Sequence, residues 1–195
     1  MNVRDLKTYP DPVLRKTADP VEVVDETTRT LILDMFKIMD EAGGIGLAAP
    51  QIGVSKRIII VSVDKKNFER LALIDPVVEY ASEDTDSMEE GCLSIPGVNA
   101  EVLRPLKVIV KGMTRSGRLV EITATHLLAR VLQHEIDHLN GVLFIDRLSE
   151  EERERVKTHL NAPEVRVQAA HMPGTSVSRA RMHGPHQLSE NQTLL

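Results

Sequence analysis

The chain has 195 residues, and its 24 basic and 29 acidic side chains give a net charge of −5. This length corresponds to roughly one domain of about 150 residues with an appendage, which is enough for a real hydrophobic core. The net negative charge disfavours non-specific binding to phosphate backbones. Two tyrosines, three phenylalanines and no tryptophan leave few rings to stack on unpaired bases. We therefore expect no nucleic-acid binding.

Membrane insertion and secretion are not expected either. No apolar run approaches the ~20 residues that a transmembrane helix needs. The first residues, MNVRD, lack the long apolar stretch of a secretory signal. The single cysteine excludes an internal disulfide and fits a reducing compartment. The composition thus predicts a cytoplasmic protein without a membrane partner.

The first predicted helix runs from Asp25 to about Ala42. Asp25 can cap its first turn. Gly43 and Gly44 end it, because glycine accepts the left-handed conformation that follows many helices. Four apolar residues recur at helical spacing on one face of this segment: Leu31, Met35, Ile38 and Met39.

The middle of the chain is predicted to be mostly strands. Four short segments are predicted to be strands: 57–63, 71–78, 104–111 and 118–123. The first two are rich in β-branched residues, which favour strands. Pro76 indicates a strand end or an edge strand. The acidic segment 82–90 is predicted to be a loop or an exposed edge, and Ser116-Gly117 marks a turn between the last two strands.

Two further helices follow these strands. Thr125 caps a helix that continues through Leu139 and is ended by Asn140-Gly141. Ser149 to Leu160 is a charged helix whose acidic residues come first and whose basic residues come later, an order that suits the helix dipole.

The composition changes after Asn161. The segment 162–195 contains prolines, glycines, serines and scattered polar residues without sustained periodicity, so we predict a disordered tail behind a single catalytic domain of residues 1–161. Three tail histidines could form a weak metal-binding tract, but a solvated tail explains them more simply: His171, His183 and His186.

The segment QHEIDH contains the most informative motif. His134 and His138 are four residues apart, so on a helix they lie on one face and can bind one metal ion. Glu135 can reach a water at that metal without being a ligand, which is the H-E-x-x-H pattern of metal-assisted hydrolysis. Burying these groups in an apolar helix without partners would be costly, which favours a functional site over a chance match.

The third ligand of such a metal is not given by the motif itself. One familiar continuation places a histidine where this chain has Phe144. Glutamates further along the chain are one alternative, although they resemble a solvated helix face and a tail: Glu150, Glu151, Glu152, Glu154 and Glu164. Cys92 is the other alternative, since a lone cysteine is either a thiolate ligand or an inert buried hydrophobe.

Three segments together resemble a known family. GIGLAAPQ at 44–51, EGCLS at 90–94 and QHEIDH at 133–138 are similar, in order and approximate spacing, to the three signature motifs of peptide deformylases. The resemblance covers about Val3 to Leu160 and is closest to the bacterial type with a C-terminal helix. Three ordered motifs are far more specific than any one of them.

This resemblance implies an α+β fold in which strands surround a central metal-binding helix, with an N-terminal helix and a C-terminal helix. It implies removal of the formyl group from the N-terminal formyl-methionine of newly synthesised polypeptides, with release of formate. It also implies one divalent metal per chain, usually Fe²⁺, with Zn²⁺, Ni²⁺ or Co²⁺ able to replace it. The implied ligands are Cys92, His134 and His138.

The chemistry of the reaction assigns roles to three further groups. Glu135 can accept the proton of the attacking water and pass it to the leaving amine. The side-chain amide of Gln51 and the backbone N–H of Leu93 can donate to the oxyanion of the tetrahedral intermediate.

Substrate contacts are expected from seven residues: Gly44, Ile45, Gly46, Glu90, Gly91, Leu128 and Val131. Gly44 and Gly46 lack a Cβ and let the peptide backbone approach, although a helix-ending turn also explains the pair. Ile45, Leu128 and Val131 are candidates to line a pocket for the methionine side chain, with Met88 near its entrance. Ordinary core packing is the alternative explanation for these apolar residues. Asp137 is expected to support the site, paired with Arg104.

Two other functions stay open on the residues alone. One is an H-E-x-x-H endopeptidase with a glutamate as third ligand, and the other is a metal-binding or ribosome-associated module without catalysis. Glu135 and Gln51 argue against the second, because a binding module needs neither. We expect a monomer whose partners are formyl-methionyl nascent peptides, and the charged helix at 149–160 could contact the ribosome.

Overall fold

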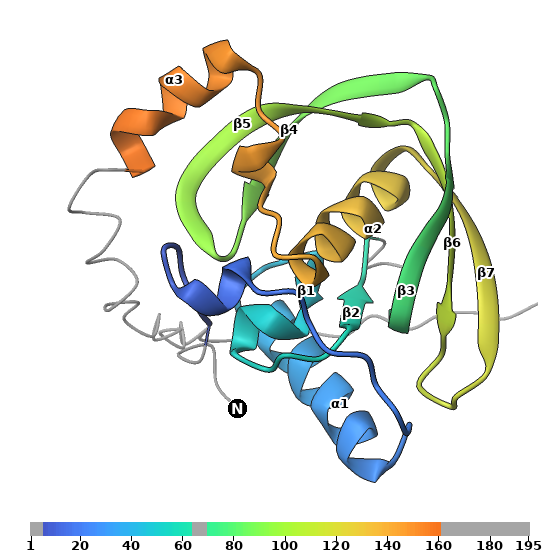
Figure 1. Ribbon diagram of the computed structural model, residues 1–195. Helices are drawn as coiled ribbons and strands as arrows, with labels where there is room; N and C mark the ends of the chain where they lie inside the picture. Colours follow the sequence, from blue (N-terminus) through green and yellow to red (C-terminus); the bar gives the residue numbers. More distant parts are fainter. Residues whose placement is uncertain (1–5, 64–69, 161–195) are drawn as a thin grey trace, which may run out of the picture.

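The computed structural model describes residues 6–63 and 70–160, which form an α+β fold as predicted (Figure 1). One antiparallel sheet has the strand order β1-β2-β3-β6-β7, and a second sheet pairs β4 with β5. The strands of the first sheet are β1 (Gly46–Ala48), β2 (Ile58–Val61), β3 (Leu71–Ala81), β6 (Lys107–Met113) and β7 (Leu119–Thr125). Those of the second are β4 (Thr85–Cys92) and β5 (Ile95–Pro105). Short 3₁₀ turns cover Pro12–Arg15, Ala49–Ile52 and Phe144–Asp146.

Helix α2 (His126–Leu139) contacts strands of both sheets. β4 and β5 curve over one side of the helix, and β3, β6 and β7 lie along the other (Figure 1). Its apolar residues Val131, Leu132, Ile136 and Leu139 are buried in one cluster with residues of the five-stranded sheet. Burial of this stripe holds α2 in place, because apolar area removed from water is the main stabilising contribution to such packing.

Helix α1 (Glu26–Glu41) confirms the first predicted helix. The Asp25 side chain accepts a hydrogen bond from the backbone N–H of Thr28 at 2.8 Å, and Gly43 has a φ of +73° just after the helix. Three of the predicted apolar residues are fully buried against β1 and β2, namely Met35, Ile38 and Met39.

The prediction for Pro76 is confirmed in part. β3 continues past this proline, but its pairing with β2 ends at Ile74, so from Pro76 onward only β6 is paired with it. Pro76 also lies where the β3–β6 register shifts between Ile74 and Val77, and Asp75 before it has a φ of +51°. A proline is tolerated at such a bulge because no ladder hydrogen bond from its nitrogen is needed there.

Of the two alternatives predicted for 82–90, a loop or an exposed edge, the exposed edge is confirmed. From Thr85 onward this segment is strand β4, whose partner β5 was not predicted as a strand. β4 exposes most of its side chains, so backbone pairing and not an apolar pattern makes it a strand. β5 does carry a signal in the sequence, since every second residue from Val98 to Arg104 is buried. The predicted strand 104–111 is in fact the end of β5 followed by β6.

Helix α3 (Glu150–Leu160) matches the predicted charged helix. Ser149 Oγ accepts from the backbone N–H of Glu152 at 3.2 Å and caps its first turn. Glu152 accepts from the N–H of Glu101, and Arg155 donates to the carbonyl of Asn99, so α3 covers the edge of β5. The predicted tail at 162–195 lies outside the described residues. Among the helices described, none has the length and apolar character needed to span a membrane.

Candidate metal centre

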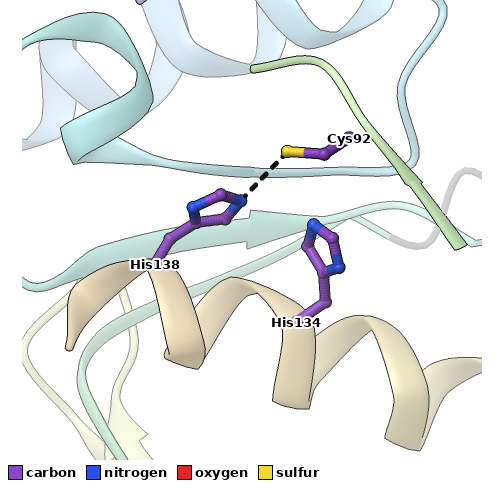
Figure 2. Close-up of side chains that lie close together, drawn as sticks. All are labelled: Cys92, His134 and His138. Atoms are coloured by element: carbon purple, nitrogen blue, oxygen red, sulfur yellow. Dashed lines mark hydrogen bonds between the residues drawn. The ribbon is translucent and has the colours of Figure 1, made fainter. Parts of the chain in front are cut away.

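Cys92, His134 and His138 form a compact cluster. The cysteine ends β4, and the two histidines project toward it from one face of α2 (Figure 2). Their ligand atoms all lie within 4.8 Å of one another, and Cys92 Sγ is 3.3 Å from Nε2 of His138. The fold therefore brings the predicted cysteine to the histidine pair. Among the described residues, Glu150, Glu151, Glu152 and Glu154 are not part of this cluster. Glu164, the remaining alternative, lies outside the described residues.

His134 and His138 differ in protonation. Burial would lower the pKa of His134, but hydrogen bonds of Cys92 and Glu90 raise it well above its usual value, so a metal at its Nε2 would displace a proton from the ring. Nδ1 of His134 lies 2.9 Å from Oε2 of Glu90. Burial alone would raise the pKa of Glu90, but hydrogen bonds and charges of His134 and Arg104 lower it to about 2. Glu90 is therefore an acceptor, Nδ1 carries the proton, and Nε2 of His134 is left for a metal. Burial lowers the pKa of His138 and keeps its imidazole in the neutral form that binds metals.

Glu135 follows the first histidine and is 4% exposed. Its Oε2 is buried without a hydrogen-bond partner among the residues described. Burial raises the pKa of this carboxyl to about 7. An unpaired buried carboxylate is costly, so its position beside three metal-ligating groups indicates a missing partner at the site. The donor set and this orphaned oxygen both fit a bound metal ion with water.

Gly46 makes room for that carboxylate. A Cβ built on Gly46 would lie 2.3 Å from Oε1 of Glu135 and 2.8 Å from Cγ1 of Val131. Any side chain here would displace the carboxylate. Close approach of a substrate backbone at Gly46 stays a prediction, and the structure adds an intramolecular reason for a glycine here that residue types alone do not reveal.

Gln51 lies in the 3₁₀ turn Ala49–Ile52 and is 1% exposed. Its Oε1 accepts a hydrogen bond from the N–H of Ala48 at 2.8 Å. Its Nε2 donates to Ser94 Oγ at 3.2 Å and lies 3.5 Å from Cys92 Sγ. A side-chain donor thus points at the metal cluster. Ser94 belongs to the EGCLS motif, but its residue type alone predicts no contact with Gln51.

Glu90 was predicted to contact the substrate. Its carboxylate is buried and receives hydrogen bonds from Arg104 at 2.6 and 3.0 Å, from Arg130 at 2.7 Å and from His134. With both oxygens engaged inside the protein, the side chain orients a histidine, and a substrate contact at this residue stays a prediction. The contact between Asp137 and Arg104 is confirmed at 2.8 Å.

The ion-pair network continues outward from Asp137. Arg147 donates to both carboxylate oxygens of Asp137, at 2.6 and 3.1 Å. This partner was missed because Arg147 comes ten residues later, after the helix has ended. Only the return of the chain across α2 brings it to Asp137.

The remaining predicted substrate residues are spread around the cluster. Ile45 is 36% exposed. Val131 is buried beside Gly46, and Leu128 packs at the margin of the same apolar cluster. A Cβ on Gly44 would lie 2.9 Å from Cδ1 of Leu93. A Cβ on Gly91 would lie 2.5 Å from Oδ1 of Asn99. Close packing within the protein therefore leaves no room for a side chain at Gly44 or Gly91.

Residues 3–154 match the polypeptide deformylase family. The chain belongs to the peptide deformylase family. Among its relatives, the peptide deformylase of Pseudomonas aeruginosa is 48% identical over 160 residues, covering 82% of this chain and 95% of the relative. The peptide deformylase of Rhizobium meliloti is 49% identical over 158 residues, covering 80% and 91%.

Solved peptide deformylases share the fold. The structure from Legionella pneumophila has a TM-score of 0.79 and 43% identity, covering 86% of this chain and 98% of that one. The structure from Synechococcus elongatus, in complex with actinonin, has a TM-score of 0.76 and 41% identity, covering 82% and 89%. The enzyme therefore removes the N-formyl group from nascent polypeptides, as predicted from the three motifs. The endopeptidase and the non-catalytic module are set aside.

Proposed function

We propose that the deformylase holds one divalent metal ion, Fe²⁺, on Cys92, His134 and His138, and that the formyl amide is hydrolysed beside it. The observation that carries this proposal is the orphaned oxygen of Glu135 next to three metal-ligating side chains. One thiolate and two imidazoles form a donor set that also accepts Zn²⁺, Ni²⁺ or Co²⁺. A divalent metal bound there would lower the pKa of a water and polarise the formyl oxygen.

Glu135 is the proton carrier in this proposal. Its buried carboxyl has a pKa near neutrality, which is the range in which a general base is most effective. It takes a proton from the attacking water and delivers it to the amine as the C–N bond of the formamide breaks. The products are formate and a free N-terminal methionine.

The oxyanion of the tetrahedral intermediate is stabilised by two donors. Nε2 of Gln51 is oriented toward the cluster by its contacts to Ala48 and Ser94. The backbone N–H of Leu93, next to the ligand Cys92, is the second donor. Donors of this kind act on charge that appears only during the reaction, so they raise kcat more than they tighten substrate binding.

The formyl-methionyl end of the peptide lies against β1 and the end of β4 in this proposal. Half-exposed Ile45, partly buried Leu128 and Val131 supply apolar surface for the methionine side chain. The backbone at 44–46 and 90–91 borders the peptide. The carboxylate of Glu90 contributes by orienting His134.

We further propose that residues 1–161 act as one monomeric catalytic domain in the cytoplasm, where nascent chains are made. The exposed charges of α3 are the surface for contact with the ribosome, since this helix projects from the β5 side of the molecule (Figure 1).

The proposal is tested by formate release from a formyl-Met peptide with anaerobically purified protein and metal analysis of the same sample. One iron per chain and stoichiometric formate release are expected. Cys92→Ala should lose most of its metal while its helical circular dichroism stays unchanged. An Ala variant that binds metal as tightly as the parent would show that the ligand assignment is wrong.

Metal identity is tested by the rate of inactivation in air. Fe²⁺ beside a thiolate oxidises readily, and the thiolate can be oxidised in turn. The iron form should therefore lose activity faster than nickel- or zinc-loaded protein, with oxidation of the Cys92 peptide seen by mass spectrometry. Equal decay of all three forms would contradict iron chemistry as the cause.

A further inference from the structure

Ser94 lies in the turn between β4 and β5 and is fully buried. Its Oγ is 3.2 Å from Nε2 of Gln51, a residue 43 positions earlier in the chain. The backbone carbonyl of Ser94 accepts from the N–H of Tyr9 at 2.8 Å, which anchors the turn from a third segment. The hydroxyl is therefore held at one fixed position against the Gln51 amide.

The orientation of that amide is determined by its other contact. The N–H of Ala48 can only donate, so the group 2.8 Å from it must be the Gln51 oxygen. The NH₂ group then faces Ser94 Oγ at 3.2 Å and Cys92 Sγ at 3.5 Å. One of its two hydrogens is taken by Ser94, and the other is directed toward the metal cluster.

We propose that Ser94 is a positioning residue for deformylation. It binds one hydrogen of the Gln51 amide, so that the second hydrogen is aimed at the oxyanion. This inference rests on the donor role proposed for Gln51. Without the hydroxyl the amide keeps its contacts to Ala48 and to Cys92 Sγ but loses its oxygen acceptor, Ser94 Oγ. A donor that is slightly misaligned stabilises the transition state less, while the substrate still binds.

The experiment compares the metal-loaded parent with Ser94→Ala, Ser94→Thr and the control Ser87→Ala. Ser87 is an exposed serine of the same strand pair whose Oγ donates to Glu101. We expect Ser94→Ala to lower kcat roughly ten-fold with little change in KM, a factor that corresponds to about 1.4 kcal/mol. Ser94→Thr, which keeps the hydroxyl, should recover most of the kcat, and Ser87→Ala should match the parent. Metal content is measured for every sample.

A double-mutant cycle separates positioning from any other role. Gln51→Ala should lower kcat by about 10²- to 10³-fold. Adding Ser94→Ala to that variant should change kcat less than two-fold, because the group it positions is already gone. An equal ten-fold loss in both backgrounds, or parent-like kcat in Ser94→Ala, overturns the inference while leaving the role of Gln51 intact. Parent-like kcat in Gln51→Ala instead overturns the donor role, and the inference with it.

A readout independent of activity is the Gln51 side-chain amide signal in a ¹H–¹⁵N NMR spectrum, assigned by its absence in Gln51→Ala. In the parent both hydrogens are buried and should exchange slowly with solvent. In Ser94→Ala one of them should exchange faster. If Ser94→Ala folds poorly, Ser94→Gly removes the same hydroxyl at a turn position and is measured in the same way. An unchanged signal in the variant that folds contradicts the proposed contact.

Discussion

The carboxylate of Glu90 accepts a hydrogen bond from Nδ1 of His134 across 2.9 Å. Strand β4 therefore supplies the ligand Cys92 and, two residues before it, the group that sets the tautomer of a second ligand. A displacement of β4 relative to α2 would disturb both at once. This coupling explains why the EGC segment and the H-E-x-x-H helix act as one unit.

Glu90→Gln should weaken metal binding by about 10- to 100-fold, the usual cost of losing a carboxylate that orients a ligating histidine. The glutamine keeps the shape of the side chain, but its amide is neutral and has one acceptor oxygen. It therefore cannot accept all the hydrogen bonds that His134 and the two arginines donate to the carboxylate. Chelator competition measures the dissociation constant. Glu89→Gln, an exposed neighbour on the same strand, is the matched control and should bind metal like the parent. Equal affinity of the two variants would contradict the orienting role.

Glu135→Gln should retain the metal and lose roughly 10²- to 10⁴-fold in formate release, the range for removal of a general acid–base group. The carboxylate is not among the three clustered ligand side chains, so metal content should not change. Metal analysis and single-turnover formate release measure the two properties. Near-parent turnover in the metal-loaded variant would show that another group moves the proton.

Gly46→Ala should lower turnover strongly, because the new Cβ would lie 2.3 Å from Oε1 of Glu135. The carboxylate has to move, whereas the three ligands are untouched. We expect a folded, metal-containing protein with a rate nearer to that of Glu135→Gln than to that of the parent. A parent-like rate would mean that Glu135 acts from a different position than the one described.

Asp137→Asn should reduce the free energy of unfolding by about 3 to 5 kcal/mol, because it removes one partner of a buried ion pair. Arg104 and Asp137 have side chains that are 3% and 8% exposed. The control is Asp40→Asn, whose pair with Arg70 is about 40% exposed and should cost at most about 1 kcal/mol. Urea denaturation in excess metal measures both. Equal small losses would show that the buried network adds little stability.

Truncation after Leu160 should leave formate release within a few-fold of the full chain. The match to the family ends at residue 154, before the tail segment. The measurement compares kcat and metal content of the two proteins. Complete loss of activity on truncation would show that the tail contributes to the catalytic domain.

Local interactions made a large part of this protein predictable from its sequence. The helix over 126–139 follows from apolar spacing and from its end at Asn140-Gly141, and two histidines four apart must lie on one of its faces. The predicted cap is wrong in one respect, because the Thr125 side chain makes no capping hydrogen bond. The cap at Asp25 and the end of α1 at Gly43 likewise depend on neighbouring residues only. The three motifs in order then identified the family and the activity.

The tertiary structure alone decided how distant segments meet. The sequence already offered Cys92 as a candidate ligand, and the tertiary structure places it beside the two histidines of α2. Glu90 points inward because two arginines surround it, and Gln51 is oriented by a serine 43 residues away. Such contacts depend on pairing register and packing between elements, which are set by the whole core and leave no pattern in neighbouring residues.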